Sequence, residues 1–208
     1  MAPSKIVCVG RNYAAHAREL GNTMSAEPVL FLKPPSSLIG DGATIVLPRA
    51  SARVEHEGEI GVVIGRRVRN ADESEARAAI GGITCVNDVT ARDLQKTDAQ
   101  WTRAKGFDTF CPAGPRVLTV DGATFDFGAL EVWCRVNGQV RQHGLARDMA
   151  FNIPFLVAYI SRVMTLEPGD LLATGTPEGV GPLLAGDVVE VEVSGVGVLR
   201  NTVAAAGK

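Results

Sequence analysis

Three glutamates alternate along a short segment that leads into an apolar run. Glu55, Glu57 and Glu59 are separated by single residues, and the apolar residues 60–64 follow them. In an extended chain, side chains two residues apart project from the same face. Glu57 and Glu59 would then present paired hard oxygen atoms, which are the ligands that Mg²⁺ and Mn²⁺ prefer. The alternative is a solvated strand face, because short acidic alternations are common.

Asp88 stands where a third carboxylate could join this pair. It lies just beyond the mostly apolar residues 83–86, and the end of a strand there would deliver its carboxylate to a shared centre. The alternative role is an N-cap for a helix beginning at residue 89. Arg92 and Gln95 follow at i, i+3 and would share a helical face, which directs a cation and an amide at one place. A surface arginine and glutamine are the alternative.

His16 and Glu19 also fall at helical spacing. Tyr13, His16 and Glu19 occupy positions i, i+3 and i+6, so on a helix they form one stripe in which the imidazole neighbours the carboxylate. A carboxylate beside an imidazole fixes its tautomer and raises its basicity, which makes a general base able to activate water. A surface ion pair is the alternative.

Two further segments are suited to binding an anion. Lys105 lies beside Gly106 and near aromatic residues, where its ammonium could face an anionic substrate or lose solvent and shift to a lower pKa. An exposed lysine is the alternative. Residues 174–181 combine three glycines with two threonines, so backbone N–H groups and hydroxyls there could cradle a carboxylate. A plain turn is the competing interpretation.

The elements that must position these residues are mostly strands. Apolar runs bounded by Gly, Pro or Asn are frequent, and helical spacing of apolar residues occurs in three places. Asn137-Gly138 predicts a hairpin turn, because both central positions of that turn need a positive φ. Ser74 is expected to cap the second helix. The expected strands are residues 5–9, 29–32, 44–46, 60–64, 83–86, 131–136, 187–193 and 196–199, and the expected helices are 14–20, 74–80 and 155–163. The pattern predicts an α+β fold in which β structure dominates.

Composition restricts the class of protein. The chain has 208 residues, of which 46% are hydrophobic and 21% charged, and no repeat or linker divides it, so we expect a single domain over residues 1–208. The net charge of −2 provides no field that would gather nucleic acid or an anionic membrane. The polar segment 11–27 is expected to be a mobile lid at the N-terminal end.

The cysteines and the apolar tracts favour a cytoplasmic location. The longest apolar tract, residues 153–166, is shorter than the ~20 residues that span a bilayer. We expect reduced, buried thiols rather than a zinc cluster, because the cysteines include no C-x-x-C pair. They are Cys8, Cys85, Cys111 and Cys134.

Taken together, six blocks of sequence resemble the fumarylacetoacetate hydrolase family. They occur in the order that the family shows and span nearly the whole chain, which makes them far more specific than any one block. The blocks are Gly10-Arg11-Asn12-Tyr13-(x)2-His16-(x)2-Glu19, Phe31-Leu32-Lys33-Pro34, His56-Glu57-Gly58-Glu59-Ile60-Gly61, Asp88-Val89-Thr90-Ala91-Arg92-Asp93-Leu94-Gln95, Lys105-Gly106-Phe107-Asp108 and Thr174-Gly175-Thr176-Pro177.

The resemblance implies a mixed β-sandwich or roll in a homodimer, with Mg²⁺ or Mn²⁺ as the cofactor. The cation would be held by Glu57, Glu59 and Asp88, the lid dyad would be His16 and Glu19, and the substrate contacts would be Arg92, Gln95, Lys105 and Thr176. The long two-domain hydrolases place another metal-binding aspartate ahead of the lid. No acidic residue lies between Met1 and His16 here, so the chain resembles the short, acylpyruvate-cleaving branch.

The same resemblance implies cleavage of a carbon–carbon bond in a small 2-oxo acid. The 1-carboxylate and 2-oxo group of the substrate would bind the cation. His16, oriented by Glu19, would activate water to attack an acylpyruvate such as fumarylpyruvate, and the cation and Lys105 would stabilise the departing pyruvate enolate. Loss of CO₂ from oxaloacetate would give the same enolate.

Two alternatives to this activity stay open. The first is a 2-hydroxyhepta-2,4-diene-1,7-dioate isomerase, or a related decarboxylase of aromatic-acid catabolism, which needs the metal and the enolate but no attacking water. The second is a noncatalytic 2-oxo-acid binding protein that kept the pocket. The presence of both His16 and Glu19 disfavours the isomerase mildly.

Overall fold

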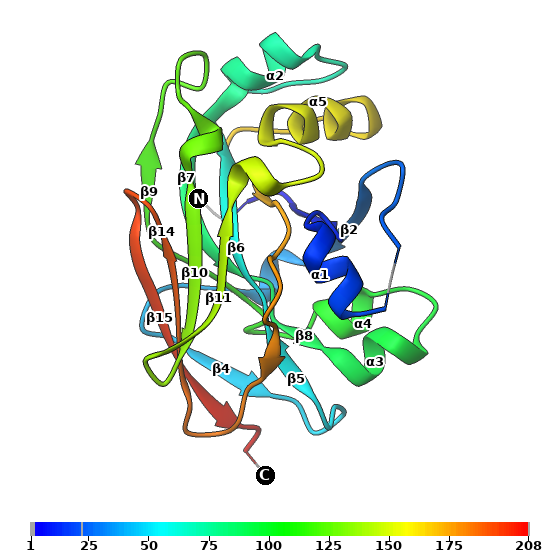
Figure 1. The fold of residues 1–208 in the computed structure, drawn as a ribbon, viewed down its shortest axis with the longest axis vertical. Coiled ribbons are helices and arrows are strands. Elements are labelled where there is room, and N and C mark those ends of the chain that lie inside the picture. The colour runs from blue at the N-terminus through cyan, green and yellow to red at the C-terminus, as the bar shows by residue number, and fades with distance from the viewer. Residues whose placement is uncertain (1–2, 22, 208) are drawn as a thin grey trace.

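Strands form the framework of the protein (Figure 1). The structure is a computed structural model that describes residues 3–21 and 23–207. The largest sheet has the strand order β2-β1-β12-β6-β7-β9-β3, the second has the order β11-β10-β14-β15-β4, and a small third sheet is ordered β13-β5-β8. The predicted α+β class with dominant β structure is therefore confirmed.

The elements follow one another along the chain with short connections. The strands are β1 (Ile6–Gly10), β2 (Val29–Lys33), β3 (Leu38–Ile39), β4 (Thr44–Leu47), β5 (Val54–His56), β6 (Gly58–Ile64), β7 (Ile80–Asn87), β8 (Thr90–Ala91), β9 (Cys111–Thr119), β10 (Glu131–Val136), β11 (Gln139–Leu145), β12 (Leu171–Ala173), β13 (Gly181–Pro182), β14 (Val188–Val193) and β15 (Gly197–Ala205). The α-helices are α1 (Ala14–Glu19), α2 (Glu73–Ala79), α3 (Arg92–Thr97), α4 (Thr102–Lys105) and α5 (Ile153–Val163).

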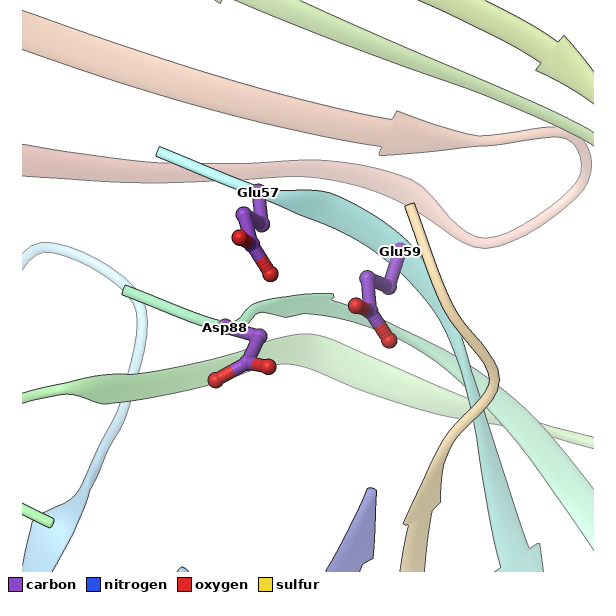
Figure 2. A group of neighbouring side chains, drawn as sticks. All are labelled: Glu57, Glu59 and Asp88. Carbon is purple, nitrogen blue, oxygen red and sulfur yellow. The ribbon is translucent and has the colours of Figure 1, made fainter. Parts of the chain in front are cut away.

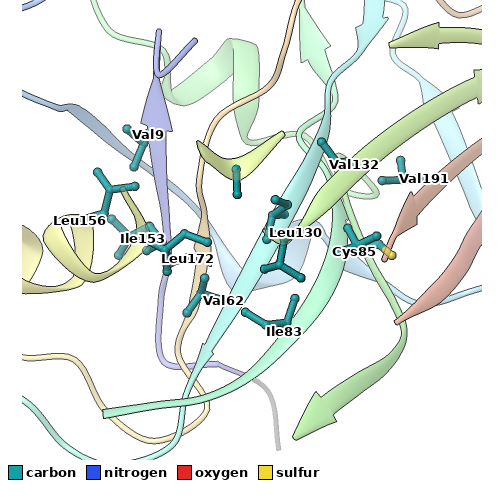
Figure 3. Packing of buried hydrophobic residues seen from close by; sticks show 14 of the residues in the cluster. Val9, Val62, Ile83, Cys85, Leu130, Val132, Ile153, Leu156, Leu172 and Val191 are labelled. Carbon is teal, nitrogen blue, oxygen red and sulfur yellow. The ribbon is translucent and has the colours of Figure 1, made fainter. Parts of the chain in front are cut away.

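The hydrophobic core lies between the two larger sheets and continues beneath α5 (Figure 3). Strands β10 and β14 of the second sheet pack against β6 and β7 of the first. Along β14, buried valines alternate with more exposed residues, as expected for a strand with one face on the core. Val62 and Ile83 of the first sheet, Val132 of the second and Ile153 of α5 belong to one buried cluster. This core fixes the strands that carry the acidic residues.

The pairing of β6 with β7 brings two of the predicted metal ligands to one edge of the sheet. The strands are antiparallel, with Gly58 opposite Asn87 and Glu59 opposite Val86. Glu57 immediately precedes β6 and Asp88 immediately follows β7, so the start of one strand and the end of the other meet. The backbone N–H of Asp88 donates to the carbonyl of Glu57 at 2.8 Å. The register therefore determines where these carboxylates lie.

Each expected strand and helix overlaps an element of the structure, and the predicted hairpin is confirmed. Strands β10 and β11 are joined by Asn137 and Gly138, which have φ of 52° and 75°. The predicted cap of α2 is wrong. Asp72, rather than Ser74, caps the helix in a capping box with Glu75, because this box satisfies two backbone N–H groups at once. Strand β9 was not expected, since two prolines interrupt its sequence and proline cannot donate to a ladder.

Two expectations about buried thiols and membrane spans can be compared with the structure. The four cysteines are free and buried, as predicted. Within residues 3–21 and 23–207, no helix has the length and apolar character needed to cross a bilayer.

Candidate metal centre and active site

Glu57, Glu59 and Asp88 converge at the edge where β6 begins and β7 ends (Figure 2). One carboxylate oxygen of each residue lies within 4.8 Å of one from each of the others. All three side chains are buried, with 4%, 1% and 1% of their residue surface exposed. Three hard oxygen donors at this spacing match the ligands of Mg²⁺ or Mn²⁺. The alternative of a solvated strand face is wrong for these residues.

Two buried lysines neutralise part of this cluster. Lys105 Nζ donates to Glu57 Oε2 at 2.8 Å and to Asp88 Oδ2 at 2.6 Å. Lys33 Nζ donates to Asp88 Oδ1 at 2.6 Å and to the carbonyl of Val89 at 3.1 Å. Burial alone would lower the pKa of Lys105, but the charges of Asp88 and Glu57 raise it above its ordinary value. Of the two possibilities considered for Lys105, the lowered pKa is therefore wrong, and Lys105 is a stable cation beside the cluster.

Glu59 is the member of the cluster without a cationic partner among the described residues. Its Oε2 accepts a hydrogen bond from the backbone N–H of Gly175 at 2.7 Å. Burial and the nearby carboxylates of Asp88 and Glu57 raise the pKa of Glu59 well above its ordinary value. In contrast, burial of Glu57 is outweighed by Lys105 and Arg92, which hold its pKa well below its ordinary range. A divalent cation would supply the missing positive charge at Glu59, so the donor set fits such an ion.

Arg92 is held by two carboxylates and an amide. Its Nε donates to Glu55 Oε2 at 2.6 Å, one terminal nitrogen donates to Glu57 Oε1, and the other donates to Gln95 Oε1. Arg92 and Gln95 thus share a face of α3, as predicted. Glu55 Oε1 also accepts from Arg53 Nε at 2.6 Å. The alternative role of Asp88 as an N-cap is wrong, because α3 begins at Arg92 and no side chain caps it.

His16 and Glu19 form a pair on α1. His16 Nδ1 lies 3.3 Å from Glu19 Oε2, and the backbone N–H of Gly179 donates to both oxygens of Glu19 at 3.1 and 3.2 Å. His16 is buried, with 4% of its surface exposed. A carboxylate on Nδ1 leaves Nε2 as the basic nitrogen of the ring. The surface-pair alternative does not describe a histidine that is buried in this way.

The loop of residues 174–181 lies against the cluster through backbone and side-chain hydrogen bonds. Gly175 has φ of 103°, and a Cβ there would come within 2.7 Å of the Asn12 side chain, so glycine is required for its N–H to reach Glu59. Thr176 Oγ1 donates to the carbonyl of Gly58 at 2.9 Å. The loop is therefore a structured part of the site rather than a plain turn.

Gln142 of β11 fixes the direction of the Thr176 hydroxyl. Gln142 Oε1 accepts from the backbone N–H of Gly58 at 3.0 Å, so its Nε2 donates to Thr176 Oγ1 at 2.7 Å and to the carbonyl of Pro177 at 2.8 Å. Because that Oε1 accepts only, His56 Nδ1 must donate to it across 3.0 Å. Burial lowers the pKa of His56, which favours its neutral form. The network therefore makes Thr176 Oγ1 an acceptor from Gln142 and a donor to the carbonyl of Gly58.

One cavity of about 510 Å³ contains every site residue predicted from the sequence. Those residues are His16, Glu19, Glu57, Glu59, Asp88, Arg92, Gln95, Lys105 and Thr176. A cavity of this size is in the range of small-molecule sites. The arrangement combines a cation-binding edge, fixed positive charges and a histidine paired with a carboxylate.

Sequence reasoning gave no role to three buried residues that support the site. Lys33 contacts Asp88, Glu55 contacts Arg92, and Gln142 contacts Thr176. The signal for Lys33 is a charged residue at the end of the apolar run 29–32, which needs a partner once it is buried. For Glu55 the signal is its shared face with Glu57. Gln142 alternates along β11 among exposed neighbours, and no signal singles it out.

Comparison with known proteins identifies a family and its relatives. Residues 5–204 match the C-terminal domain of fumarylacetoacetate (FAA) hydrolase. An Arabidopsis thaliana protein named oxaloacetate tautomerase FAHD1, mitochondrial, is 46% identical over 93% of this chain and 87% of its own. A Dictyostelium discoideum protein named oxaloacetate decarboxylase, mitochondrial, is 44% identical over 92% of this chain and 89% of its own.

Solved structures agree with these sequence matches. The crystal structure of a 5-carboxymethyl-2-hydroxymuconate delta-isomerase from Mycobacterium smegmatis superposes with a TM-score of 0.91 at 47% identity, covering 100% of this chain and 81% of that one. The fold, the sequence blocks and the buried acidic cluster lead to one conclusion. This chain belongs to the fumarylacetoacetate hydrolase family of enzymes.

Proposed function

We propose that this chain is a divalent-cation-dependent enzyme that generates the enolate of a small 2-oxo acid by breaking a carbon–carbon bond. The observation that carries the proposal is the buried cluster of Glu57, Glu59 and Asp88, whose ligand atoms lie within 4.8 Å of one another. These residues would hold Mg²⁺, with Mn²⁺ as an acceptable substitute because both take the same oxygen ligands. When bound, the cation supplies a Lewis acid for the 1-carboxylate and 2-oxo group of the substrate.

The cations and amides around the cluster would bind and orient the substrate. Arg92 is fixed by Glu55 and Glu57, so its guanidinium is held in place before the substrate arrives. Gln95 uses Oε1 to accept from Arg92, which leaves its amide N–H groups for a substrate oxygen. Thr176 accepts from Gln142 and donates to Gly58, so its remaining lone pair would accept a hydrogen bond. Groups that are already held in position would lower the activation barrier, because they need not reorient during the reaction.

Lys105 would stabilise the negative charge that develops during cleavage. Its ammonium is buried, touches Glu57 and Asp88, and remains protonated because these carboxylates raise its pKa. The electron pair released from the broken bond spreads onto the 2-oxo oxygen of the pyruvate fragment. A fixed, buried ammonium would strongly stabilise negative charge on that oxygen.

His16 would hold or move a proton at its Nε2. In hydrolysis of an acylpyruvate, it would take a proton from the water that attacks the distal carbonyl, and Glu19 would stabilise the resulting imidazolium. Segment 11–27 would act as a lid that keeps bulk water out. The hydrogen bonds from Gly179 to Glu19 support a closed position of α1.

Decarboxylation or tautomerisation of oxaloacetate is the second candidate, and the names of the Arabidopsis and Dictyostelium relatives favour it. These reactions share the enolate but need no attacking water. The isomerase alternative, suggested by the name of the Mycobacterium smegmatis structure, likewise moves a proton without hydrolysis. In these cases His16 would transfer a proton to or from a substrate carbon.

A kinetic comparison of four substrates distinguishes the reactions. Purified protein with Mg²⁺ would be tested with acetylpyruvate, fumarylpyruvate, oxaloacetate and 2-hydroxyhepta-2,4-diene-1,7-dioate. We expect turnover of at least one substrate and its loss when Mg²⁺ is chelated. Absence of turnover with the whole panel would support the noncatalytic binding alternative instead.

Calorimetry tests the cation site directly. Glu57→Gln and Asp88→Asn should weaken Mg²⁺ binding and activity together, because each removes one negative ligand. Glu73→Gln on α2 is a matched control, since Glu73 is exposed and does not line the cavity that contains the cluster. Unchanged Mg²⁺ affinity in both site variants would refute the assignment.

A further inference from the structure

Arg11 is an unpaired cation on the wall of the cavity that contains the cluster. It lines the cavity, is half-buried and makes no ion pair or hydrogen bond with its side chain among the described residues. Its guanidinium carbon lies 6.0 Å from the centre of the Trp101 ring, at the limit of a cation–π contact. Arg53, another arginine of this cavity, is already paired with Glu55. Arg11 is therefore free to bind an anion.

The local backbone is built to hold Arg11 against Trp101. Arg11 has φ of 60°, the left-handed region that side chains other than glycine rarely adopt, and such strain concentrates at functional positions. A Cβ at the preceding Gly10 would lie 2.9 Å from the Trp101 ring. The glycine thus allows the indole to approach the end of β1, and the turn places Arg11 beside it.

An aromatic wall connects Arg11 to the acidic cluster. Lys105 Nζ, which touches Glu57 and Asp88, lies 4.9 Å from the centre of the Phe31 ring. Phe31 in turn meets the Trp101 ring edge to face at 5.3 Å, and both rings line the cavity. Phe31 belongs to β2, Lys105 belongs to α4, and Trp101 immediately precedes α4; β2 and α4 lie beside α1 (Figure 1). A cation thus stands at each end of a continuous aromatic surface.

We propose that Arg11, supported by Trp101, binds a second carboxylate at the far end of the substrate, so that the enzyme selects 2-oxo acids with an anionic tail over those with a neutral tail. The inference rests on the proposed function, because the 2-oxo acid end must lie at the cluster. The flat faces of Phe31 and Trp101 suit a planar or unsaturated segment between the two carboxylates. A guanidinium forms paired hydrogen bonds with a carboxylate, which a neutral tail cannot accept as strongly.

The test compares ligands that differ only at the tail. Calorimetry with Mg²⁺ present would use three matched pairs with five-, six- and seven-carbon chains: 2-oxoglutarate and 2-oxopentanoate, 2-oxoadipate and 2-oxohexanoate, and 2-oxopimelate and 2-oxoheptanoate. We expect one diacid to bind about tenfold or more tightly than its neutral partner, as for hydrogen bonds to a charged group. Arg11→Gln should remove this advantage and leave the affinity for the neutral partner unchanged. Arg11→Lys should retain part of it.

Two control variants make the assignment specific. Arg18→Gln removes an exposed arginine of α1 that does not line the cavity, and it should preserve the preference. Lys96→Gln removes the other cation of the cavity wall that has no ion pair among the residues the structure describes. Loss of the diacid preference in Lys96→Gln, but not in Arg11→Gln, would overturn the role of Arg11. Equal affinity for both members of every pair overturns the inference alone. Failure of all six ligands to bind overturns the proposed function as well.

Discussion

Lys33 offers the sharpest test of the electrostatic description of the site. Its side chain is fully buried, and its ammonium lies 2.6 Å from Asp88 Oδ1, whose side chain is 1% exposed. Replacement by methionine keeps the length and apolar character of the side chain but removes the charge. Among the described residues, Asp88 then keeps Lys105 alone as a cationic partner, and the carbonyl of Val89 loses a donor.

The size of the effect follows from the burial of both partners. Removing one member of a buried ion pair costs about 3–5 kcal/mol, because an uncompensated charge stays inside. Since Lys105 still contacts Asp88, we expect the lower end, about 3 kcal/mol, in the metal-free protein. For a chain of this size, that corresponds to a fall in Tm of about 6–12 °C. Added Mg²⁺ should restore part of the lost stability, because a ligand that binds the folded state stabilises it.

Denaturant unfolding with and without Mg²⁺ provides the assay, and a double-mutant cycle provides the control. Lys33→Met should cost less in an Asp88→Asn background, because the charge that Lys33 neutralises is already absent. Lys96 is exposed and has no ion pair among the described residues. Lys96→Met should therefore change the unfolding free energy by less than about 0.5 kcal/mol. An equal cost of Lys33→Met in both backgrounds would refute the reasoning.

Three other variants probe separate parts of the site. Glu59→Gln should weaken Mg²⁺ binding more than about tenfold, as measured by calorimetry. The unfolding free energy of the metal-free protein should stay within about 1 kcal/mol, because this buried carboxylate has no cationic partner among the described residues to lose. Unchanged Mg²⁺ affinity together with a large loss of stability would show that Glu59 is purely structural. His16→Ala should reduce acylpyruvate hydrolysis by about 10²–10⁴-fold, and full retained activity in a stopped or continuous assay would exclude water activation by His16. Gln142→Ala should lower the unfolding free energy by about 1–3 kcal/mol, because it leaves buried groups unpaired. Gln139 of the same strand is exposed, so Gln139→Ala should leave the unfolding free energy nearly unchanged. Equal urea midpoints for the two variants would contradict the hydrogen-bond network described for Gln142.

Local patterns predicted the elements well where one physical cause was dominant. Asn137-Gly138 indicated the hairpin because its turn needs two positive φ values, and the apolar run within residues 187–193 indicated β14. Ser74 was the wrong cap because the reciprocal bonds between Asp72 and Glu75 are stronger than a single cap. The preference of a single residue for the cap position therefore predicts the cap only when all neighbouring candidates, and the bonds between them, are considered together.

The site was only partly predictable because its supporting contacts are distant in sequence. The predicted residues were recognised from six blocks, and the structure brings them to one cavity. Lys33 and Asp88 are 55 residues apart, Glu55 and Arg92 are 37 apart, and Gln142 and Thr176 are 34 apart. No spacing rule joins such pairs, because sheet order rather than sequence separation makes them neighbours.

The loop of residues 174–181 has a thermodynamic consequence for the enzyme cycle. Through Gly175 it contacts Glu59, and through Gly179 it contacts Glu19 on α1. If the cation draws Glu59 into a position that favours this loop conformation, then the cation and the closed α1 stabilise each other. Thermodynamic linkage makes this coupling reciprocal. Binding of the cation increases the equilibrium constant for closure of α1 by some factor, and closure increases the affinity for the cation by the same factor. The enzyme would then release its metal most readily when it is open, and hold it most firmly while the substrate is enclosed.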